Sequence, residues 1–126
     1  MRLLWDTHAI LWFMLGDAQL SATASALIGA PENECLFSPA SHWEMAIKIS
    51  IGKYEIDEDF ETLWRDVEKR FGVLHIEPRH TTRLIDFPFH HRDPFDRLLV
   101  AQALVEGIPL VSRDATLDAY GVRRIW

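Results

Sequence analysis

Four acidic side chains occupy positions from which their carboxylates could act together: Asp6, Glu44, Asp96 and Asp114. Asp6 directly follows the apolar run LLW, and Asp114 follows LVSR. Glu44 lies in SPASHWEMAIKI and Asp96 in DPFDRLLVAQA, both near expected helix starts. Carboxylates gathered in one cleft repel one another, and a divalent cation relieves that repulsion. The set therefore indicates a site for Mg²⁺, with Mn²⁺ as the alternative, because both ions prefer oxygen ligands.

The chemistry that such a site favours is hydrolysis of a phosphodiester, in which the cation positions water and stabilises charge on phosphate oxygens. A bound cation would also explain how a chain of acidic composition could bind nucleic acid. The formal net charge of −6 disfavours nucleic acid as a partner, since proteins that bind it are usually basic. A bound cation can be the largest local charge in a site and reverse that expectation there.

Each acid also has an ordinary structural interpretation. Asp6 and Asp114 could cap the helices that follow them. Asp96 could complement the dipole in the first turn of its helix. Glu44 could form a weak surface pair with Lys48 at the i,i+4 spacing. Taken singly, only Asp6 resists the structural interpretation, because it stands between two runs that are expected to be buried.

Asp93 competes with Asp96 for the role of metal ligand. Pro94 directly follows Asp93, and proline at the first helical position makes Asp93 the favoured N-cap. Asp96 is then free to bind metal. Asp118 lies about one helical turn beyond Asp114, and we expect it to be solvated.

Short apolar segments that read as strands alternate with helical segments along the chain. The expected strands are Arg2–Trp5, Glu34–Phe37, Val73–Ile76, Ile108–Val111 and Val122–Ile125. The expected helices are Thr7–Leu15, Ser21–Ile28, Ser41–Ile51, Asp59–Phe71, Arg79–Phe87, Pro94 to Gly107 and Asp114–Tyr120. This alternation predicts one domain over residues 1–126, a three-layer α/β/α sandwich with a central, mostly parallel sheet. Ligands bind such sheets outside the carboxyl ends of the strands, which is where Asp6 and Asp114 fall.

Three cations neighbour the acids and are candidates for contact with substrate phosphate: Arg97, Arg113 and Lys48. An ordinary surface position, or pairing with the acids, is an equally open interpretation for the arginines. Lys53, in the GK turn, is a weaker candidate of the same kind.

Histidines, aromatic residues and the cysteine give less specific signals. His90 and His91 are adjacent, which suits one ion poorly, and without nearby cysteines zinc is not expected. His8 could lie near the cleft, although a helix-surface or core-edge position is favoured. The five tryptophans could stack on bases. Trp64 fits an apolar helix stripe and so favours the core, whereas Trp12 and Trp43 could serve a protein interface.

The bulk of the sequence points to a cytoplasmic protein. Cys35 is the single cysteine, so no internal disulfide can form, and we expect a buried thiol in a reducing compartment. Asp6 and His8 interrupt the N-terminal apolar stretch, so no secretion signal is expected. No apolar run reaches the length of about 18 residues that a membrane span needs.

Four segments together resemble the PIN-domain family, and more narrowly the toxin ribonucleases of VapBC-type toxin–antitoxin modules. They are WDTHAILW, SPASHWEMAIKISIGK, HHRDPFDRLLVAQAL and LVSRD followed by YGVRRIW, and they span essentially the whole chain. The resemblance implies a metal-dependent endoribonuclease on a small α/β/α sandwich. It also implies a homodimer and a cognate antitoxin protein whose C-terminal segment covers the active-site groove.

The resemblance also assigns residues. The acidic quartet of the family falls on Asp6, Glu44, Asp96 and Asp114. Ser112 matches the polar residue that accompanies the last acid, Ser41 matches a position three residues before Glu44, and Thr7 is expected to support the site. The RNA that is cut, and whether one or two ions bind, stay open.

Other functions fit the residues less well. A phosphatase that forms an aspartyl intermediate would need a second aspartate two residues after Asp6, where this chain has His8. A phospho-receiver domain would need a late lysine where Ser112 and Arg113 stand. A catalytically silent PIN-like module that only binds a partner protein remains the alternative, and titration with metal would separate it from the enzyme.

Overall fold

A five-stranded sheet forms the centre of the computed structural model, which describes all of residues 1–126. The strands lie in the order β3-β2-β1-β4-β5, and every neighbouring pair is parallel. Their bounds are β1 (Arg2–Trp5), β2 (Glu34–Phe37), β3 (Gly72–Val73), β4 (Leu110–Val111) and β5 (Arg124–Ile125). The expected parallel sheet is confirmed, with no antiparallel strand.

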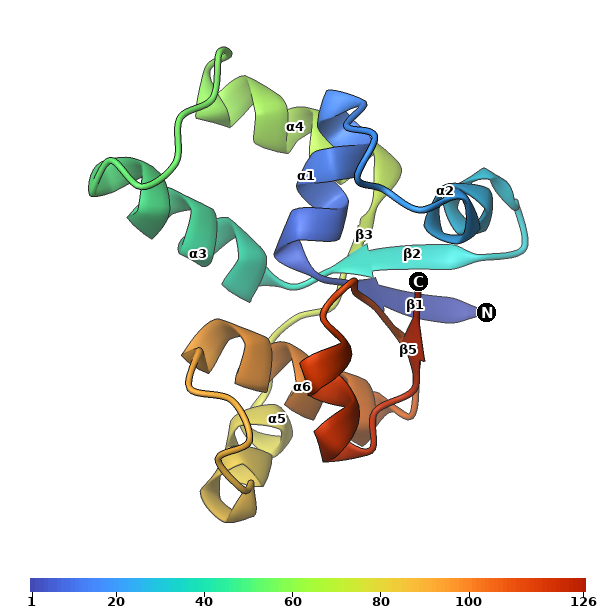
Figure 1. The fold of residues 1–126 in the computed structure, drawn as a ribbon, viewed down its shortest axis with the longest axis vertical. Helices are drawn as coiled ribbons and strands as arrows, with labels where there is room; N and C mark the ends of the chain where they lie inside the picture. Colours follow the sequence, from blue (N-terminus) through green and yellow to red (C-terminus); the bar gives the residue numbers. More distant parts are fainter.

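Helices cover both faces of this sheet (Figure 1). They are α1 (Thr7–Leu15), α2 (Ala22–Gly29), α3 (Pro39–Ser50), α4 (Phe60–Arg70), α5 (Pro78–Arg83) and α6 (Pro94–Glu106), with 3-10 helices η1 (Leu84–Asp86) and η2 (Ala115–Tyr120). Leu3 and Trp5 of β1 pack against α1, α2 and α4. Leu4 points to the other face, where α6 and η2 lie. The predicted α/β/α sandwich is therefore confirmed. None of the helices combines the length and the apolar character needed to cross a bilayer.

Three strands are shorter than the sequence indicates, and local chemistry explains part of this difference. β4 begins at Leu110 rather than Ile108 because Pro109 has no N–H to add to a ladder. β3 pairs with β2 only through Gly72 and Val73, so the predicted strand to Ile76 is wrong beyond that point. β5 is likewise confined to its two paired residues.

Two helices differ from their predicted bounds by two residues or more. α3 starts at Pro39 because the Ser38 hydroxyl accepts the Ala40 N–H at 3.1 Å, which caps the helix two residues earlier than expected. The predicted helix Arg79–Phe87 changes to a 3-10 turn after Arg83 and stops before Pro88, since proline disfavours the helical conformation in the preceding residue.

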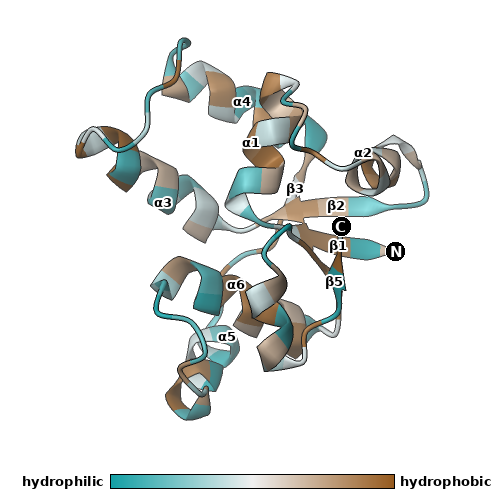
Figure 2. Cartoon of the chain, viewed as in Figure 1, coloured by the Kyte–Doolittle hydropathy of each residue, from teal (hydrophilic) through white to brown (hydrophobic).

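The register between β1 and β4 brings two candidate segments to the same edge. Leu4 pairs with Leu110 and Trp5 with Val111, so Asp6 and Ser112 follow neighbouring strands at their carboxyl ends. The Asp6 N–H extends the ladder by donating to the Val111 carbonyl at 3.0 Å. In Figure 2, β1 has hydrophilic colour at its N-terminal end and hydrophobic colour beyond it, and hydrophilic colour returns where the chain passes into α1.

The helix that carries Glu44 is held at this edge by a small core of its own. Leu11 of α1, Met45 of α3 and Leu63 of α4 are buried against one another. This contact fixes α3 beside the first turn of α1 and so sets Glu44 near the end of β1. Cys35 is buried in β2, as predicted.

Candidate metal centre

Asp6 and Asp114 are both N-caps, as their positions allow. One oxygen of Asp6 accepts the Ala9 N–H at 2.8 Å and so begins α1. One oxygen of Asp114 accepts the N–H and the hydroxyl of Thr116, at 3.0 and 2.6 Å, at the start of η2. Capping therefore accounts for Oδ1 of each carboxylate. Both side chains also line one pocket of about 300 Å³, so the cap positions and a shared cleft coincide.

Ser112 connects these two strand-end acids. Its hydroxyl oxygen accepts the Asp114 N–H at 3.1 Å. Hydrogen bonding from Ser112 also favours the charged form of the Asp6 carboxylate. Ser112 is completely buried, so its hydroxyl serves the two acids and not solvent.

Asp93 is the N-cap of α6, as the sequence predicts. Asp93 caps α6, since one of its oxygens accepts the N–H groups of Phe95 and Asp96 at 2.8 and 3.2 Å. The Asp96 side chain takes no part in the cap. Its Oδ2 lies 3.6 Å from Nε2 of His91.

Glu44 is buried, with only 2% of its surface exposed, and protein donors contact both of its oxygens. The Thr7 hydroxyl donates to Oε1 at 2.7 Å, and Nζ of Lys48 donates to Oε2 at 2.6 Å. The Ser41 hydroxyl, also buried, lies 2.9 Å from that of Thr7. The i,i+4 pairing of Glu44 with Lys48 is confirmed, but Glu44 is buried and Lys48 half-buried, so it is not the expected surface pair.

The charges of these acids converge on Asp96. Burial, followed by the negative charges of four other acids, raises the pKa of Asp96 to about 7. Those acids are Asp93, Glu44, Asp6 and Asp114. All four predicted acids are thus close enough in space for each of the other three to act on Asp96. An uncompensated negative charge at this point is what a cation would stabilise.

The other two aspartates respond to their surroundings in opposite directions. Burial raises the pKa of Asp6 above its usual range, although hydrogen bonds from Ser112 and Ala9 act against that shift. Burial also acts to raise the pKa of Asp114, but hydrogen bonds from Thr116 and His91 outweigh it, and the pKa lies below its usual range. Asp114 is therefore ionised at neutral pH beside an Asp96 that is close to its midpoint.

His91 is a site residue that the sequence did not predict. Its Nε2 lies 3.2 Å from Oδ2 of Asp114, and the ligand atoms of His91, Asp96 and Asp114 all lie within 4.8 Å of one another. His90 instead packs edge-on against Tyr120, so the two histidines do not act as a pair. The sequence feature that could have indicated His91 is its position two residues before Asp93, the N-cap of α6.

The donor set fits a small divalent cation. Asp6 and Asp114 line one pocket, and the ligand atoms of Asp96, Asp114 and His91 lie within 4.8 Å of one another, so Asp114 belongs to both groups. Carboxylate oxygens are the hard ligands that Mg²⁺ and Mn²⁺ select. No cysteine lies among them, which argues against zinc. The imidazole of His91 is a softer donor, and imidazole is not a ligand that Mg²⁺ prefers.

The predicted phosphate contacts differ in accessibility. The expectation for Arg97 is wrong: the residue is buried, its guanidinium donates to the Phe87 carbonyl at 3.0 Å and lies 4.0 Å from the centroid of the Phe89 ring. Lys48 is committed to Glu44. Arg113 is exposed and lines the pocket beside Asp6 and Asp114.

The other candidate residues named from the sequence differ in burial and in their contacts. Lys53 is exposed in the turn after α3. Asp118 is not simply solvated, because it forms two hydrogen bonds with Arg124, at 2.8 and 3.2 Å. Trp64 is in the core, as predicted, whereas Trp43 is 60% exposed. His8 is exposed at the pocket with Trp12.

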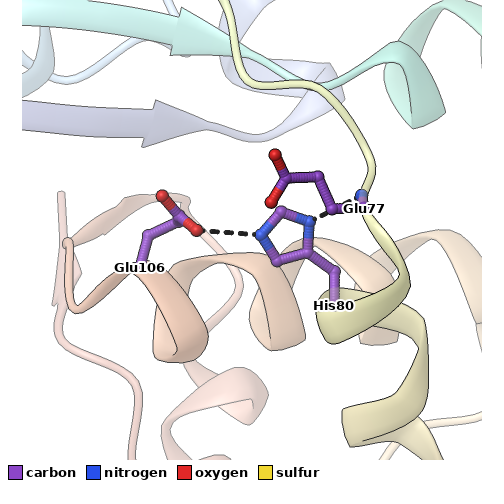
Figure 3. A group of neighbouring side chains, drawn as sticks. All are labelled: Glu77, His80 and Glu106. Carbon is purple, nitrogen blue, oxygen red and sulfur yellow. Dashed lines mark hydrogen bonds and ion pairs between the residues drawn. The ribbon is translucent and has the colours of Figure 1, made fainter.

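A second group of acids and histidine lies at the opposite edge of the sheet and is structural. His80 of α5 is fully buried between Glu77 and Glu106 (Figure 3). Its Nδ1 accepts the Glu77 N–H at 3.0 Å, and its Nε2 contacts Glu106 at 2.9 Å, so neither ring nitrogen is free for a metal. Glu106 is further paired with Arg79 and with Arg2 at the start of β1. The group ties α5 to α6.

Comparison with known proteins agrees with this architecture. The sequence profile of the PIN domain matches residues 3–122. No curated protein matches the chain in sequence. Solved structures of similar fold include VapBC2 from Rickettsia felis bound to a DNA fragment from its promoter, with a TM-score of 0.73 at 12% identity over 99% of this chain and 98% of that one.

Two other solved structures are similar to a comparable degree. VapBC-1 from nontypeable Haemophilus influenzae has a TM-score of 0.65 at 15% identity over 99% of this chain and 97% of that one. A toxin–antitoxin complex from Klebsiella pneumoniae has a TM-score of 0.66 at 17% identity over 98% and 96%. At these identities the structures show a shared fold. Since the profile match covers nearly the whole chain and the parallel α/β/α sandwich agrees with it, this chain belongs to the PIN-domain family.

Proposed function

We propose that this chain, acting as one domain over residues 1–126, is a metal-dependent endoribonuclease and the toxin of a type II toxin–antitoxin pair. The observation that carries the proposal is the convergence of the three other acids on Asp96, because like charges are gathered in this way where a cation is to be held. The VapBC and toxin–antitoxin complexes among the similar structures support the assignment to a toxin. The choice of RNA over DNA rests on the family resemblance.

In this proposal Asp6, Asp96 and Asp114 hold Mg²⁺, or Mn²⁺ in its place. The cation, when bound, supplies Lewis acidity and an activated water for attack on a phosphodiester. Asp6 and Asp114 are held by their caps, and Ser112 and His91 add contacts to Asp114, so both carboxylates are oriented before a cation binds.

Glu44 acts beside this set with two neighbours that hold its orientation. Thr7 and Lys48 donate to its oxygens, and Ser41 lies against Thr7. The Glu44 pair raises the pKa of Lys48 against the effect of burial, so the ammonium stays charged and offsets part of the negative charge around Asp96. Both ring nitrogens of His91 have partners, since Nδ1 accepts the Asp93 N–H at 3.3 Å and Nε2 lies 3.2 Å from Oδ2 of Asp114, so we assign His91 the role of positioning Asp114 beside the start of α6.

The toxin–antitoxin complexes among the similar structures support a protein partner. We propose a cognate antitoxin protein that occludes the site, RNA as substrate, and a homodimer as the active assembly, in a cytoplasmic setting. A silent PIN-like module would bind the partner protein without needing the cation.

The experiment that tests the function is cleavage of pooled small RNA by the purified chain, freed of any bound partner, with Mg²⁺, with Mn²⁺ and with EDTA. We expect cleavage with either ion and none with EDTA. Asp96→Asn should lower the rate by at least about 100-fold, because it removes a ligand and not only an outer-shell contact.

A matched control tests whether loss of one negative charge elsewhere in the chain also lowers the cleavage rate. Asp66→Asn removes one negative charge from the exposed surface of α4 and should leave the rate unchanged. If the folded wild-type chain binds no Mg²⁺ or Mn²⁺ in a calorimetric titration and cuts no RNA, the chain is a binding module and the proposal is wrong.

A further inference from the structure

The pocket beside the acids is lined by groups of two kinds. Asp6 and Asp114 contribute carboxylates. His8 and Trp12 of α1 contribute aromatic rings, and Arg113 of the loop after β4 contributes a cation. A site that held only a metal ion would need the carboxylates alone. The volume of about 300 Å³ extends beyond what a hydrated ion requires and leaves room for a larger group.

Arg113 is placed to bind an anion in this pocket. It is exposed and takes part in none of the ion pairs of the structure. Its Nη1 donates to Oε1 of Gln19 at 3.0 Å, and its guanidinium carbon lies 5.8 Å from the centroid of the Trp12 ring. These two contacts orient the group and leave most of its donors free for a phosphate, which arginine can bind through two parallel hydrogen bonds.

Trp12 and His8 supply an aromatic surface next to that cation. Their rings lie 5.6 Å apart with an interplanar angle of 35°. The ring centroid of Trp126 lies 5.8 Å from that of Trp12, so the two rings pack together. Trp12 is half-buried and His8 exposed, so the pair presents aromatic rings to the pocket. Bases of single-stranded nucleic acid stack on aromatic side chains in this way, with little dependence on sequence.

We propose that this pocket binds the nucleotide adjacent to the scissile phosphate of single-stranded RNA. Arg113 contacts the phosphate of that nucleotide, and Trp12 with His8 stacks on its base. The inference rests on the proposed function, because Asp6 and Asp114, which would hold the cation, line the same pocket. A paired strand is excluded from this pocket, since its bases are stacked within the helix and cannot reach Trp12.

The first test measures binding of two probes to the full chain in Mg²⁺: adenosine 5′-monophosphate and ribose 5-phosphate. Neither contains a phosphodiester, so neither is consumed. We expect the nucleotide to bind at least about fivefold more tightly, because only it has a base to stack. Arg113→Gln should weaken binding of both probes by about tenfold. Trp12→Leu should reduce the affinity for the nucleotide to that for ribose 5-phosphate.

Controls address charge and folding. Arg123→Gln removes the same charge from an exposed position just before β5, outside the residues that line the pocket, and should leave both affinities unchanged. Arg113 and His8 are exposed, so Arg113→Gln and His8→Ala remain informative if Trp12→Leu unfolds the chain. Circular dichroism establishes which variants are folded.

The second test measures cleavage of a single-stranded RNA dodecamer of mixed sequence. We expect Arg113→Gln to raise KM by about tenfold while kcat stays within about twofold of wild type, since the residue binds substrate and does not hold the cation. Wild-type cleavage with unchanged KM and unchanged probe affinities in Arg113→Gln would overturn the inference and leave the proposed function standing. A wild-type chain that neither binds nor cuts RNA would overturn the proposed function, and this inference with it.

Discussion

Replacing Asp96 by asparagine should stabilise the metal-free protein while it removes metal binding. Asp96 lies among four other acids, and its only close polar partner is His91 at 3.6 Å. Asparagine has the same shape without the charge, so it ends the repulsion without opening a cavity. A substitution that raises stability and removes activity identifies a position retained for function.

The magnitude follows from the pKa of Asp96, which is about 7 in the folded chain against a usual value of 3.8. Between these two pH values the folded state holds more protons than the unfolded state, so stability of the wild type falls as pH rises through this window. Above about pH 7 the loss is complete. At about 1.36 kcal/mol per pKa unit the loss reaches about 4 kcal/mol, and partial exposure of the side chain reduces our expectation to about 2–4 kcal/mol.

The assay is urea denaturation in EDTA at several pH values from 4 to 8.5, comparing Asp96→Asn with wild type and with Asp66→Asn. The advantage of Asp96→Asn should be near zero at pH 4, grow up to about pH 7 and then level off. Asp66→Asn should stay within about 0.5 kcal/mol of wild type throughout. Addition of Mg²⁺ should stabilise wild type more than Asp96→Asn. An Asp96→Asn variant that is less stable than wild type at pH 8, or equally shifted at every pH, would refute the reasoning.

Three further predictions concern the supporting residues. Because Asp96 must lose its proton to hold the cation, the apparent Kd for Mg²⁺ should rise about tenfold for each pH unit below about 7 in calorimetric titrations, and a pH-independent Kd would contradict this. Thr7→Val removes the hydroxyl that donates to the buried Glu44 and should destabilise the chain by about 1–3 kcal/mol in urea denaturation, whereas Thr7→Ser keeps that hydroxyl and should lose less; a Thr7→Val variant as stable as wild type would contradict this. His80→Leu leaves the Glu77 N–H without its acceptor and should destabilise by about 1–3 kcal/mol, yet RNA cleavage per folded molecule should match wild type, and a change in metal dependence would count against a structural role.

Much of the architecture was available from the sequence because it depends on local interactions. Pro94 after Asp93 marked the start of α6, and both the cap and the helix are where that dipeptide indicates. Gly16 and Gly107 follow their helices with φ of +65° and +67°, the left-handed conformation that glycine adopts readily. Alternation of short strands with helices required a parallel sheet, and the carboxyl edge of that sheet located Asp6.

Other features depended on which side chains meet across elements that are distant in the chain. The strand ends were not predictable from apolar character alone, since β3 extends only as far as β2 runs beside it. Arg97 looked like a phosphate contact from its neighbour in sequence, but the side chain is packed on Phe89. In each case a partner from another segment decided the outcome.

The candidate metal centre also combines features set by the local sequence with features set by tertiary contacts. The sequence by itself determined that acids of the right type stand at helix starts and strand ends, because caps and strand termini are local. Only the tertiary structure decided that Glu44 is buried against Thr7 and that His91 joins Asp114, because each of these contacts joins side chains from separate elements. Charge repulsion at Asp96 likewise arises only once the fold has brought the other carboxylates to it.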